Sequence, residues 1–486
     1  MAKITTLADD ALIAFDNLSD LAGKLVTPSV RLGVTGLARS GKTVFITALV
    51  HNLLHGGRLP LFTPYSSGRL KSAALAPQPT FDMPRFQYEP HVRTLLEQRE
   101  WPQSTRSISE LRITIEYESA SAWQRTFGSG RFNIDIVDYP GEWLLDLPLL
   151  ARDYGQWAGE ALSLASGGRR NELGADWLKL TRATNPSGPA DEMQVQALAA
   201  AFTAYLRSCR EDETALSTLP PGRFLMPGDL EGSPALTFAP LAIPADGEIG
   251  EGTLAAMMRD RYEAYKRHVI KPFFREHFAR LDRQIVLVDV LSVINAGPDA
   301  VADLETALSG IMACFRPGQG SILSNLFGPR IDRVLFAATK ADHLHHENHD
   351  RLEALLAAMV QKASERARFA GAHTDVLALS AIRSTREAFA SQDGERLPVI
   401  VGTPMAGETI DGETFDGETE TAIFPGDLPK NPTTLLRPGT GKSLPELRFV
   451  RFRPPELEVT GDGLKLSMPH IRLDRALEFL LGDKLA

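Results

Sequence analysis

The eight residues from Gly36 to Thr43 carry the strongest chemical signal in the sequence. They read Gly-Leu-Ala-Arg-Ser-Gly-Lys-Thr and match the phosphate-binding Walker A pattern G-x-x-x-x-G-K-[ST] in full. In such a loop, backbone N–H groups wrap a β-phosphate, Lys42 reaches the β- and γ-phosphate oxygens, and the Thr43 hydroxyl ligates Mg²⁺. A glycine-rich turn without a ligand is the competing interpretation. The loop stands between an apolar strand pattern and a helix pattern, which favours a nucleoside triphosphate.

A second motif, D-x-x-G, occurs at Asp138–Gly141, directly after an apolar strand pattern. There Asp138 could hold Mg²⁺ through water, and the Gly141 N–H could sense the γ-phosphate. The copy of this pattern at Asp229–Gly232 lies in a proline-rich stretch, and we interpret it as without function. Glu142 stands where Ras-like enzymes carry the glutamine that orients the attacking water. A glutamate could do the same, or hydrolysis could be slow until a partner helps.

Two later motifs point to the base. Thr339-Lys340-Ala341-Asp342 fits [NT]-K-x-D and follows a strand pattern. A carboxylate at Asp342 can accept the N1–H and the exocyclic N2–H₂ of guanine together, a pair that adenine lacks, while the Lys340 stem covers the base. After the next strand pattern, Ser380 and Ala381 provide a backbone N–H for guanine O6. The order of the motifs therefore predicts GTP.

Two further residues bear on catalysis. A threonine ahead of the D-x-x-G strand should close on Mg²⁺ and the γ-phosphate; Thr105 is the best placed, and Thr63 and Thr80 remain open. Arg39 could act as a built-in arginine finger or could be a solvated loop arginine. The predicted nucleotide-binding residues are Gly36, Ala38, Arg39, Ser40, Gly41, Lys42, Thr43, Val44, Gly141, Thr339, Lys340, Asp342, Ser380, Ala381 and Ile382. The predicted catalytic residues are Lys42, Thr105, Glu142 and Arg39, and the predicted Mg²⁺ ligands are Thr43, Thr105 and Asp138.

The elements that must position these motifs alternate between strand and helix patterns. Strand patterns cover residues 30–36, 111–117, 132–137, 285–291, 333–338 and 375–379. Helix patterns cover 300–315, 351–368 and 470–481, residues 56–107 read as irregular, and 447–452 reads as a strand. Between 144 and 283 the pattern is mostly helical, with a kink expected at Pro272. We predict an α/β fold with a helical insertion and a C-terminal extension that contains β-structure.

The chain contains the motif GLARSGKT, the segment WPQSTRSISELRITIEY and the motif ATKADHL. Together they make it resemble the YcjX-like family of bacterial P-loop GTPases, which is associated with stress responses. The resemblance spans nearly the whole length. It implies a P-loop NTPase core of Ras-like type with large insertions, and a membrane protein as a candidate partner. The expected domains are an N-terminal amphipathic helix (1–28), two halves of the GTPase domain (29–145 and 284–385), a helical insertion domain (146–283) and the C-terminal extension (386–486).

Composition limits the function classes. The chain has 486 residues, 43% hydrophobic and 23% charged, with 52 basic and 61 acidic side chains and a net charge of −9. An acidic balance argues against a general nucleic-acid binder. The cysteines, Cys209 and Cys314, lie far apart, which is consistent with a reducing compartment. No signal-peptide or membrane-span pattern is present, so we expect a cytoplasmic protein, at most peripherally associated with the inner membrane.

Four alternatives stay open at this stage. The chain could be a GTP-dependent interaction scaffold with negligible intrinsic hydrolysis, or an ATPase that uses Asp289 as its strand-end acid. His345 and His349, four residues apart, could bind zinc, but we expect the histidines at 343, 345, 346 and 349 to form a solvated helical turn. The Gly-Glu-Thr repeat at 407, 412 and 417 could bind calcium, although an acidic hairpin or loop is the favoured interpretation.

Overall fold

The computed structural model describes residues 27–36, 40–103, 107–120, 130–212, 219–243, 249–314, 331–392, 395–436, 447–456 and 467–486. The chain divides into two compact units, each treated separately below. Of the described residues, the sheet unit takes those within Leu18–Tyr139, Leu281–Val301 and Ile331–Ala486, and the helical unit takes those within Pro140–Arg280 and Ala302–Arg330. The helix predicted over residues 1–28 falls, except for its last two residues, outside the described part of the chain.

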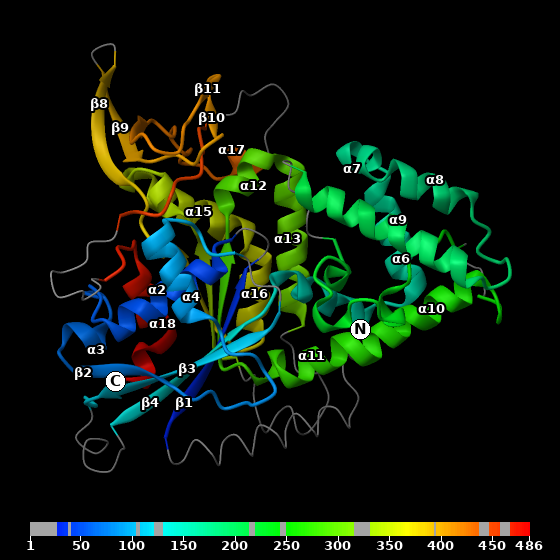
Figure 1. Ribbon diagram of the computed structural model, residues 1–486, viewed down its shortest axis with the longest axis horizontal. Coiled ribbons are helices and arrows are strands. Elements are labelled where there is room, and N and C mark those ends of the chain that lie inside the picture. Colours follow the sequence, from blue (N-terminus) through cyan, green and yellow to red (C-terminus); the bar gives the residue numbers. More distant parts are fainter. Residues whose placement is uncertain are drawn as a thin grey trace. The chain divides into compact units, whose positions relative to one another are not determined.

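A seven-stranded mixed sheet forms the centre of the sheet unit (Figure 1). Its strands, in spatial order, are β2 (Leu70–Ala76), β3 (Ser109–Tyr117), β4 (Arg131–Asp138), β1 (Ser29–Gly36), β5 (Arg283–Val288), β6 (Arg333–Ala338) and β7 (His373–Ala378). The strands from β4 to β7 run parallel, whereas β3 pairs antiparallel with both β2 and β4. The α/β class is therefore confirmed, with a parallel-rich sheet.

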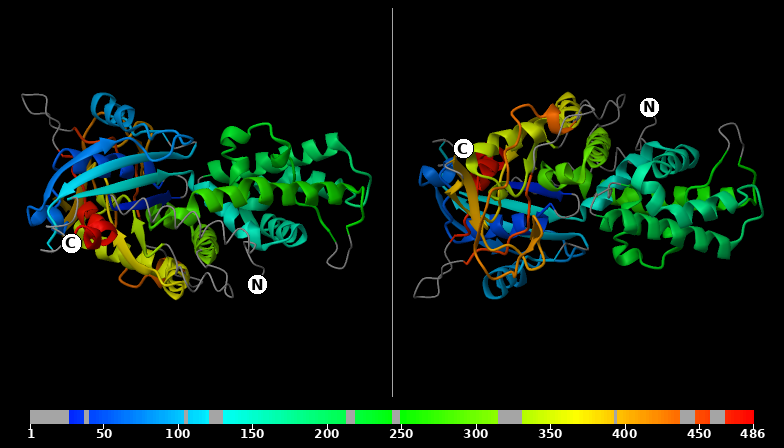
Figure 2. Two further views of the ribbon diagram at one scale, coloured as in Figure 1. Left: turned by 90° about the horizontal axis from the view of Figure 1, so that it is seen from below. Right: turned by 90° about the horizontal axis from the view of Figure 1, so that it is seen from above.

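Helices cover both faces of this sheet. On one face, α2 (Lys42–Leu54), α4 (Tyr88–Arg93) and α18 (Leu473–Leu481) share one hydrophobic core with alternate residues of the strands. The red helix α18 lies beside the sheet in every view (Figure 2) and packs on β6. On the other face, α15 (His349–Met359) and α16 (Gln361–Phe369) pack against β6 and β7 and contribute nothing to that core. The helix predicted over residues 470–481 forms α18, which packs on this core.

The parallel strands end at one edge of the sheet, where their loops carry the sequence motifs. The pairing aligns Gly36 of β1 with Leu287 of β5, and Ala338 of β6 with both Val288 and Ala378. Strand β1 lies between β4 and β5. The chain continues from β1 to the β2–β3–β4 side of the sheet and then crosses to β5 on the other side of β1. Such a switch point is where open α/β sheets bind ligands.

Three sequence predictions in the sheet unit were wrong. Residues 56–107, expected to be irregular, contain α3 (Thr63–Ser66), β2, α4 and the π-helical turn η1 (Thr94–Gln98). The strand predicted over 285–291 ends at Val288, because Asp289 caps the helix α12 (Val290–Ala296) through the Ser292 N–H. Residues 447–452 form no strand, and only Phe452 makes an isolated bridge, to Pro404.

The helical unit begins with η2 (Gly141–Ala151), a 3₁₀ helix that contains Pro148. The helices that follow are α6 (Tyr154–Ala165), α7 (Gly168–Leu173), α8 (Ala175–Ala183), α9 (Glu192–Glu211), α10 (Leu254–Tyr265) and α11 (Lys271–Glu276). Short 3₁₀ turns cover Gly222–Phe224, Gly228–Leu230, Pro234–Leu236 and Phe278–Arg280. Between α10 and α11 the π-helical turn η6 (Lys266–Ile270) precedes Pro272, which sits in the first turn of α11. Helix α13 (Pro298–Ala313) spans the boundary between the two units.

The C-terminal region adds small sheets to the sheet unit. Strands β8 (Arg386–Gln392), β9 (Glu395–Gly402) and β12 (Thr421–Ile423) form one antiparallel sheet, and β10 (Thr409–Ile410) and β11 (Glu413–Thr414) form a short hairpin. The remaining elements are the short helix α17 (Thr433–Leu436) and the 3₁₀ turns η8 (Ala341–His343), η9 (His346–Asn348) and η10 (Gly482–Lys484). Among the described helices, none combines the length and apolar character needed to cross a membrane. Both cysteines are free and buried.

Candidate functional site

The glycines of the phosphate loop are required by its geometry. A Cβ added at Gly36 would lie 2.0 Å from Ser40 Oγ, and Gly41 has a left-handed φ of 79°. Gly41 is the N-cap of α2, and no described side chain caps this helix. The Ser40 hydroxyl is buried and has no hydrogen-bond partner among the described residues, so it can donate to a ligand. The loop and the helix N-terminus thus fit a phosphate. Leu37, Ala38 and Arg39 lie outside the described residues, so the alternatives for Arg39 stay open.

Lys42 connects the first two motifs. Its ammonium group donates a charge-assisted hydrogen bond to the Asp138 carboxylate, and a second hydrogen bond of 2.7 Å to the backbone oxygen of Tyr139. Both charged side chains are buried. The strand register accounts for this proximity, because Asp138 is paired with Val34 on the neighbouring parallel strand β1. A phosphate ligand would have to draw Lys42 away from Asp138, and this would expose the carboxylate to a cation.

The segment before Thr105 reaches the same place. The backbone oxygen of Gln103 lies 3.5 Å from Thr43 Oγ1. Thr105 itself lies outside the described residues. The other two candidates have different partners: the Thr80 hydroxyl bonds the buried Glu110 carboxylate at 2.5 Å, and Thr63 is exposed in α3. Of the three threonines, Thr105 is the one that follows, two residues later, a residue in contact with the end of the phosphate loop.

The base-recognition motif is held by a residue that sequence analysis did not identify. Ser384 donates two hydrogen bonds to Asp342 Oδ2, from its backbone N–H at 2.8 Å and from its hydroxyl at 2.6 Å. The Asp342 side chain is only 3% exposed, and no described residue donates to its Oδ1. The hydroxyl of Thr385 also bonds the Asp342 backbone oxygen. The carboxylate is therefore fixed in orientation and keeps acceptor capacity for a base.

Lys340 is positioned by Asp289, which sequence analysis considered only as the strand-end acid of an ATPase. It has a left-handed φ of 60°, and its ammonium group forms an ion pair with Asp289, which follows the neighbouring strand β5. Asp289 also accepts hydrogen bonds from the N–H and the hydroxyl of Ser292. Burial alone would raise the pKa of Asp289, but the charge and hydrogen bond of Lys340 and the bonds from Ser292 outweigh it and hold the pKa below its ordinary value. Asp289 is thus an ionised anchor for Lys340.

The third loop at this edge contains Ser380, Ala381 and Ile382. Ser380 exchanges backbone hydrogen bonds with Ile471, and its hydroxyl donates to the Ile382 backbone oxygen at 2.8 Å. The Ile382 side chain belongs to the hydrophobic core. Since the Ser380 N–H is already engaged, Ala381 is the residue of this pair whose N–H can face a base.

Glu142 and Gly141 belong to the helical unit, where Gly141 is the first residue of η2. The Glu142 carboxylate is buried and lies 3.1 Å from the Arg210 guanidinium of α9. Sequence analysis treated Glu142 as a side chain available to orient water, whereas here an arginine occupies one of its oxygens. The second D-x-x-G copy lies on the 3₁₀ turn Gly228–Leu230 and follows no strand.

Comparison with known proteins agrees with this geometry. The model of the YcjX-like family matches residues 30–485 of the chain. The chain belongs to the YcjX-like family. It is 39% identical over 484 residues to the Ras-like GTPase YcjX of Escherichia coli (strain K12), covering 97% of this chain and 99% of the relative. It is 34% identical over 475 residues to the Ras-like GTPase YcjX of Shewanella oneidensis, covering 94% of each. The resemblance drawn from the motifs is therefore confirmed.

One prediction near the base site of this YcjX-like protein was wrong. The histidines after Asp342 were expected to be solvated, but His345 and His349 are buried. The Nε2 atom of His349 lies 2.9 Å from the Ala341 backbone oxygen, which joins α15 to the base-recognition loop. The ring of His345 packs edge-on against Phe389 of β8, at 5.1 Å between ring centroids. Of these four histidines, only His346 is largely exposed.

Proposed function

We propose that the chain binds GTP with Mg²⁺ and hydrolyses it to GDP and phosphate, and that it acts as a stress-linked molecular switch. The observation that supports this best is the alignment of strand ends. The loops Gly36–Thr43, Thr339–Asp342 and Ser380–Ile382 follow β1, β6 and β7, parallel strands that end at the same edge of the sheet, with β5 between β1 and β6. A phosphate site and a base site along one edge of the sheet are what one nucleotide needs. The family relatives named Ras-like GTPase add to this support.

The proposed phosphate chemistry rests on charge and position. Lys42 exchanges Asp138 for the β- and γ-phosphate oxygens, while the Ser40 hydroxyl and the amides of the first turn of α2 contact the β-phosphate. Thr43, Asp138 and Thr105 are the residues that would hold Mg²⁺. When bound, that ion neutralises charge on the phosphate oxygens. The buried oxygens of Thr43 and Asp138 are of the hard type that Mg²⁺ prefers.

Guanine selectivity is proposed to come from Asp342. Its carboxylate accepts the two guanine donors, Ser384 holds its orientation, and Asp289 holds the Lys340 stem beside the base. The Ala381 N–H donates to guanine O6. Adenine presents an acceptor where guanine presents N1–H, so two acceptors would face each other in the ATP complex and ATP would bind more weakly.

A second function, a GTP-dependent interaction scaffold with negligible intrinsic hydrolysis, is favoured by one observation. The Glu142 carboxylate is paired with Arg210, and a side chain so engaged does not orient water unless the pair opens. The effector would be a protein of unknown identity, with a membrane protein as one candidate, and no nucleic acid is expected. The third candidate, an ATPase that uses Asp289, has less support because Lys340 and Ser292 already occupy that carboxylate.

Single-turnover hydrolysis separates the first two functions. The purified chain is mixed in excess over GTP with Mg²⁺, phosphate release is followed, and ATP is tested as a competitor. We expect GTP binding that ATP does not displace, with phosphate release that slows in Glu142→Ala, which has no side chain to orient water. Tight GTP binding without phosphate release would support the scaffold. Equal binding of ATP would contradict both.

The domain division and the location follow as proposals. We propose that residues 29–145 and 284–385 form the GTPase domain, with the helical insertion domain at 146–283 and the extension at 386–486. We also propose a cytoplasmic location, with at most peripheral association with the inner membrane. Fractionation of cells that express the chain, with and without a high-salt wash, tests the location.

A further inference from the structure

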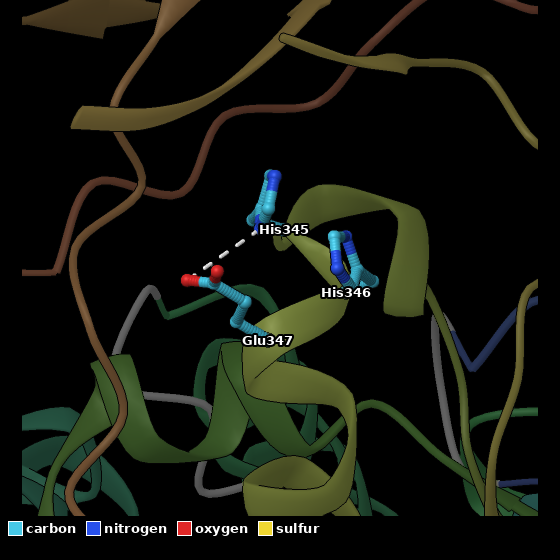
Figure 3. A group of neighbouring side chains, drawn as sticks. All are labelled: His345, His346 and Glu347. Atoms are coloured by element: carbon cyan, nitrogen blue, oxygen red, sulfur yellow. Dashed lines mark ion pairs between the residues drawn. The ribbon is translucent and has the colours of Figure 1, made fainter. Parts of the chain in front are cut away.

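The turn after the base-recognition motif carries three neighbouring groups that can bind metal. His345, His346 and Glu347 leave the same turn, directly before α15 (Figure 3), and one ligand atom from each lies within 4.8 Å of the others. The ring of His345 is 1% exposed, and its Nδ1 atom has no hydrogen-bond partner among the described residues. That nitrogen lies 3.9 Å from Glu347 Oε2, beyond hydrogen-bond range. A buried polar atom without a partner is costly, so a group that satisfies it would stabilise the turn.

We propose that His345, His346 and Glu347 bind one divalent transition-metal ion, with Zn²⁺ as the best fit. Two imidazole nitrogens and a carboxylate oxygen suit Zn²⁺ and leave a fourth position for water. With ligands at about 2.1 Å, a tetrahedral site has ligand atoms about 3.4 Å apart. The Glu347 side chain is largely exposed and can rotate to close the present spacing around the fixed His345 ring.

A carboxylate outside the three ligands supports the site. Glu387 of β8 places its Oε2 2.6 Å from His346 Nδ1, and Arg383 lies 3.4 Å from the other oxygen of Glu387. Metal-binding histidines generally give their second ring nitrogen to such a carboxylate, which fixes the ring and its tautomer. Glu387 thus orients His346 and leaves Nε2 for the ion. The Phe389 ring packs edge-on against the His345 ring and adds to the contacts that hold it.

The position of the site determines which parts of the chain a bound ion would connect. His345 is three residues beyond Asp342, and Glu387 belongs to the β8–β9 hairpin. An ion on His346 would therefore link this hairpin, through Glu387, to the loop that follows β6. Because the ion binds the folded chain, it should raise the free energy of unfolding by mass action. The site is distinct from the proposed Mg²⁺ position at Thr43 and Asp138, and its existence does not depend on GTP hydrolysis.

The test uses the full chain without an affinity tag, stripped with EDTA and free of nucleotide and Mg²⁺. Co²⁺ is titrated while the visible d–d absorption of the ion is followed, and Zn²⁺ is then added to displace it. We expect one ion per chain, Co²⁺ bands of a low-coordinate site, and displacement by Zn²⁺. Glu347→Gln and His346→Gln should each weaken binding at least tenfold, because both remove an exposed ligand without disturbing the core.

His373→Gln is the matched control, since His373 is an exposed histidine of β7 outside the cluster, and it should bind as the wild type does. His345→Asn should abolish binding but could unfold the turn, so the two exposed variants decide the outcome. Absence of d–d bands and of retained Zn²⁺ would overturn the proposal. Equal affinity in the wild type, Glu347→Gln and His346→Gln would also overturn it, because the ion would then lie elsewhere.

Discussion

Removal of the Ser384 hydroxyl tests how the base site is positioned. Ser384→Ala deletes the 2.6 Å hydrogen bond to Asp342 Oδ2 and leaves the 2.8 Å bond from the backbone N–H. A hydrogen bond to a charged group contributes about 1.5–3 kcal/mol. Because the remaining N–H still holds Oδ2, we expect a loss from GTP binding near or somewhat below the lower end of that range, about 1–2 kcal/mol. Since 1.4 kcal/mol is a factor of ten, GTP affinity should fall about five- to thirtyfold.

The assay is competition against a fluorescent GDP analogue at fixed Mg²⁺, with GTP and ATP as competitors. Ser384→Thr keeps a hydroxyl and should retain most of the affinity, whereas Ser391→Ala changes an exposed serine of β8 and should have no effect. Wild-type GTP affinity in Ser384→Ala would refute the role of the hydroxyl. A parallel loss for GTP and ATP would also refute it, because the effect would then not concern the base.

Two further predictions concern the phosphate loop and the helical unit. Gly36→Ala should weaken nucleotide binding at least tenfold, since the new Cβ would lie 2.0 Å from Ser40 Oγ. Adding Ser40→Gly should restore part of the affinity. A double variant that binds no better than Gly36→Ala alone would contradict the steric argument. Burial raises the pKa of Asp146 to about 6, although hydrogen bonds from Tyr265 and Gly222 oppose the shift. The protonated Asp146 carboxyl therefore adds to the free energy of unfolding below pH about 4, and this contribution is lost as the pH rises through 6. Over that interval urea unfolding should show the wild type losing stability relative to Asp146→Asn, on the order of 3 kcal/mol, and parallel pH profiles would contradict this.

The phosphate loop and the parallel strands could be predicted because their signals are local. Glycine is required at position 36 by the close contact with Ser40 and at position 41 by the left-handed φ, and both positions lie within one eight-residue loop. Strands β5 and β6 are buried apolar runs that turn signals delimit. Strand β2 was missed because it is an edge strand with a largely exposed, alanine-rich sequence, and its pairing with β3 is visible only in the fold.

The residues that position the site could not be predicted, because their contacts join distant parts of the chain. Ser384 is 42 residues from Asp342, and Asp289 is 51 residues from Lys340. The pairing of Glu142 with Arg210 likewise depends on how α9 packs within the helical unit. The burial of His345 follows from the position of Phe389 on the β8 strand, which the spacing of the histidines does not encode.

The nucleotide specificity of Asp342→Asn tests the central claim most directly. In the wild type, GTP should bind much more tightly than ATP or XTP. The asparagine amide presents a donor in place of one carboxylate oxygen, so it should repel the exocyclic N2–H₂ of guanine and donate a hydrogen bond to the carbonyl that xanthine carries at that position. We predict that Asp342→Asn loses GTP affinity by a hundredfold or so, about 3 kcal/mol, and gains affinity for XTP. Unchanged GTP binding in the variant, or tight ATP binding in the wild type, would contradict the assignment of this site to guanine.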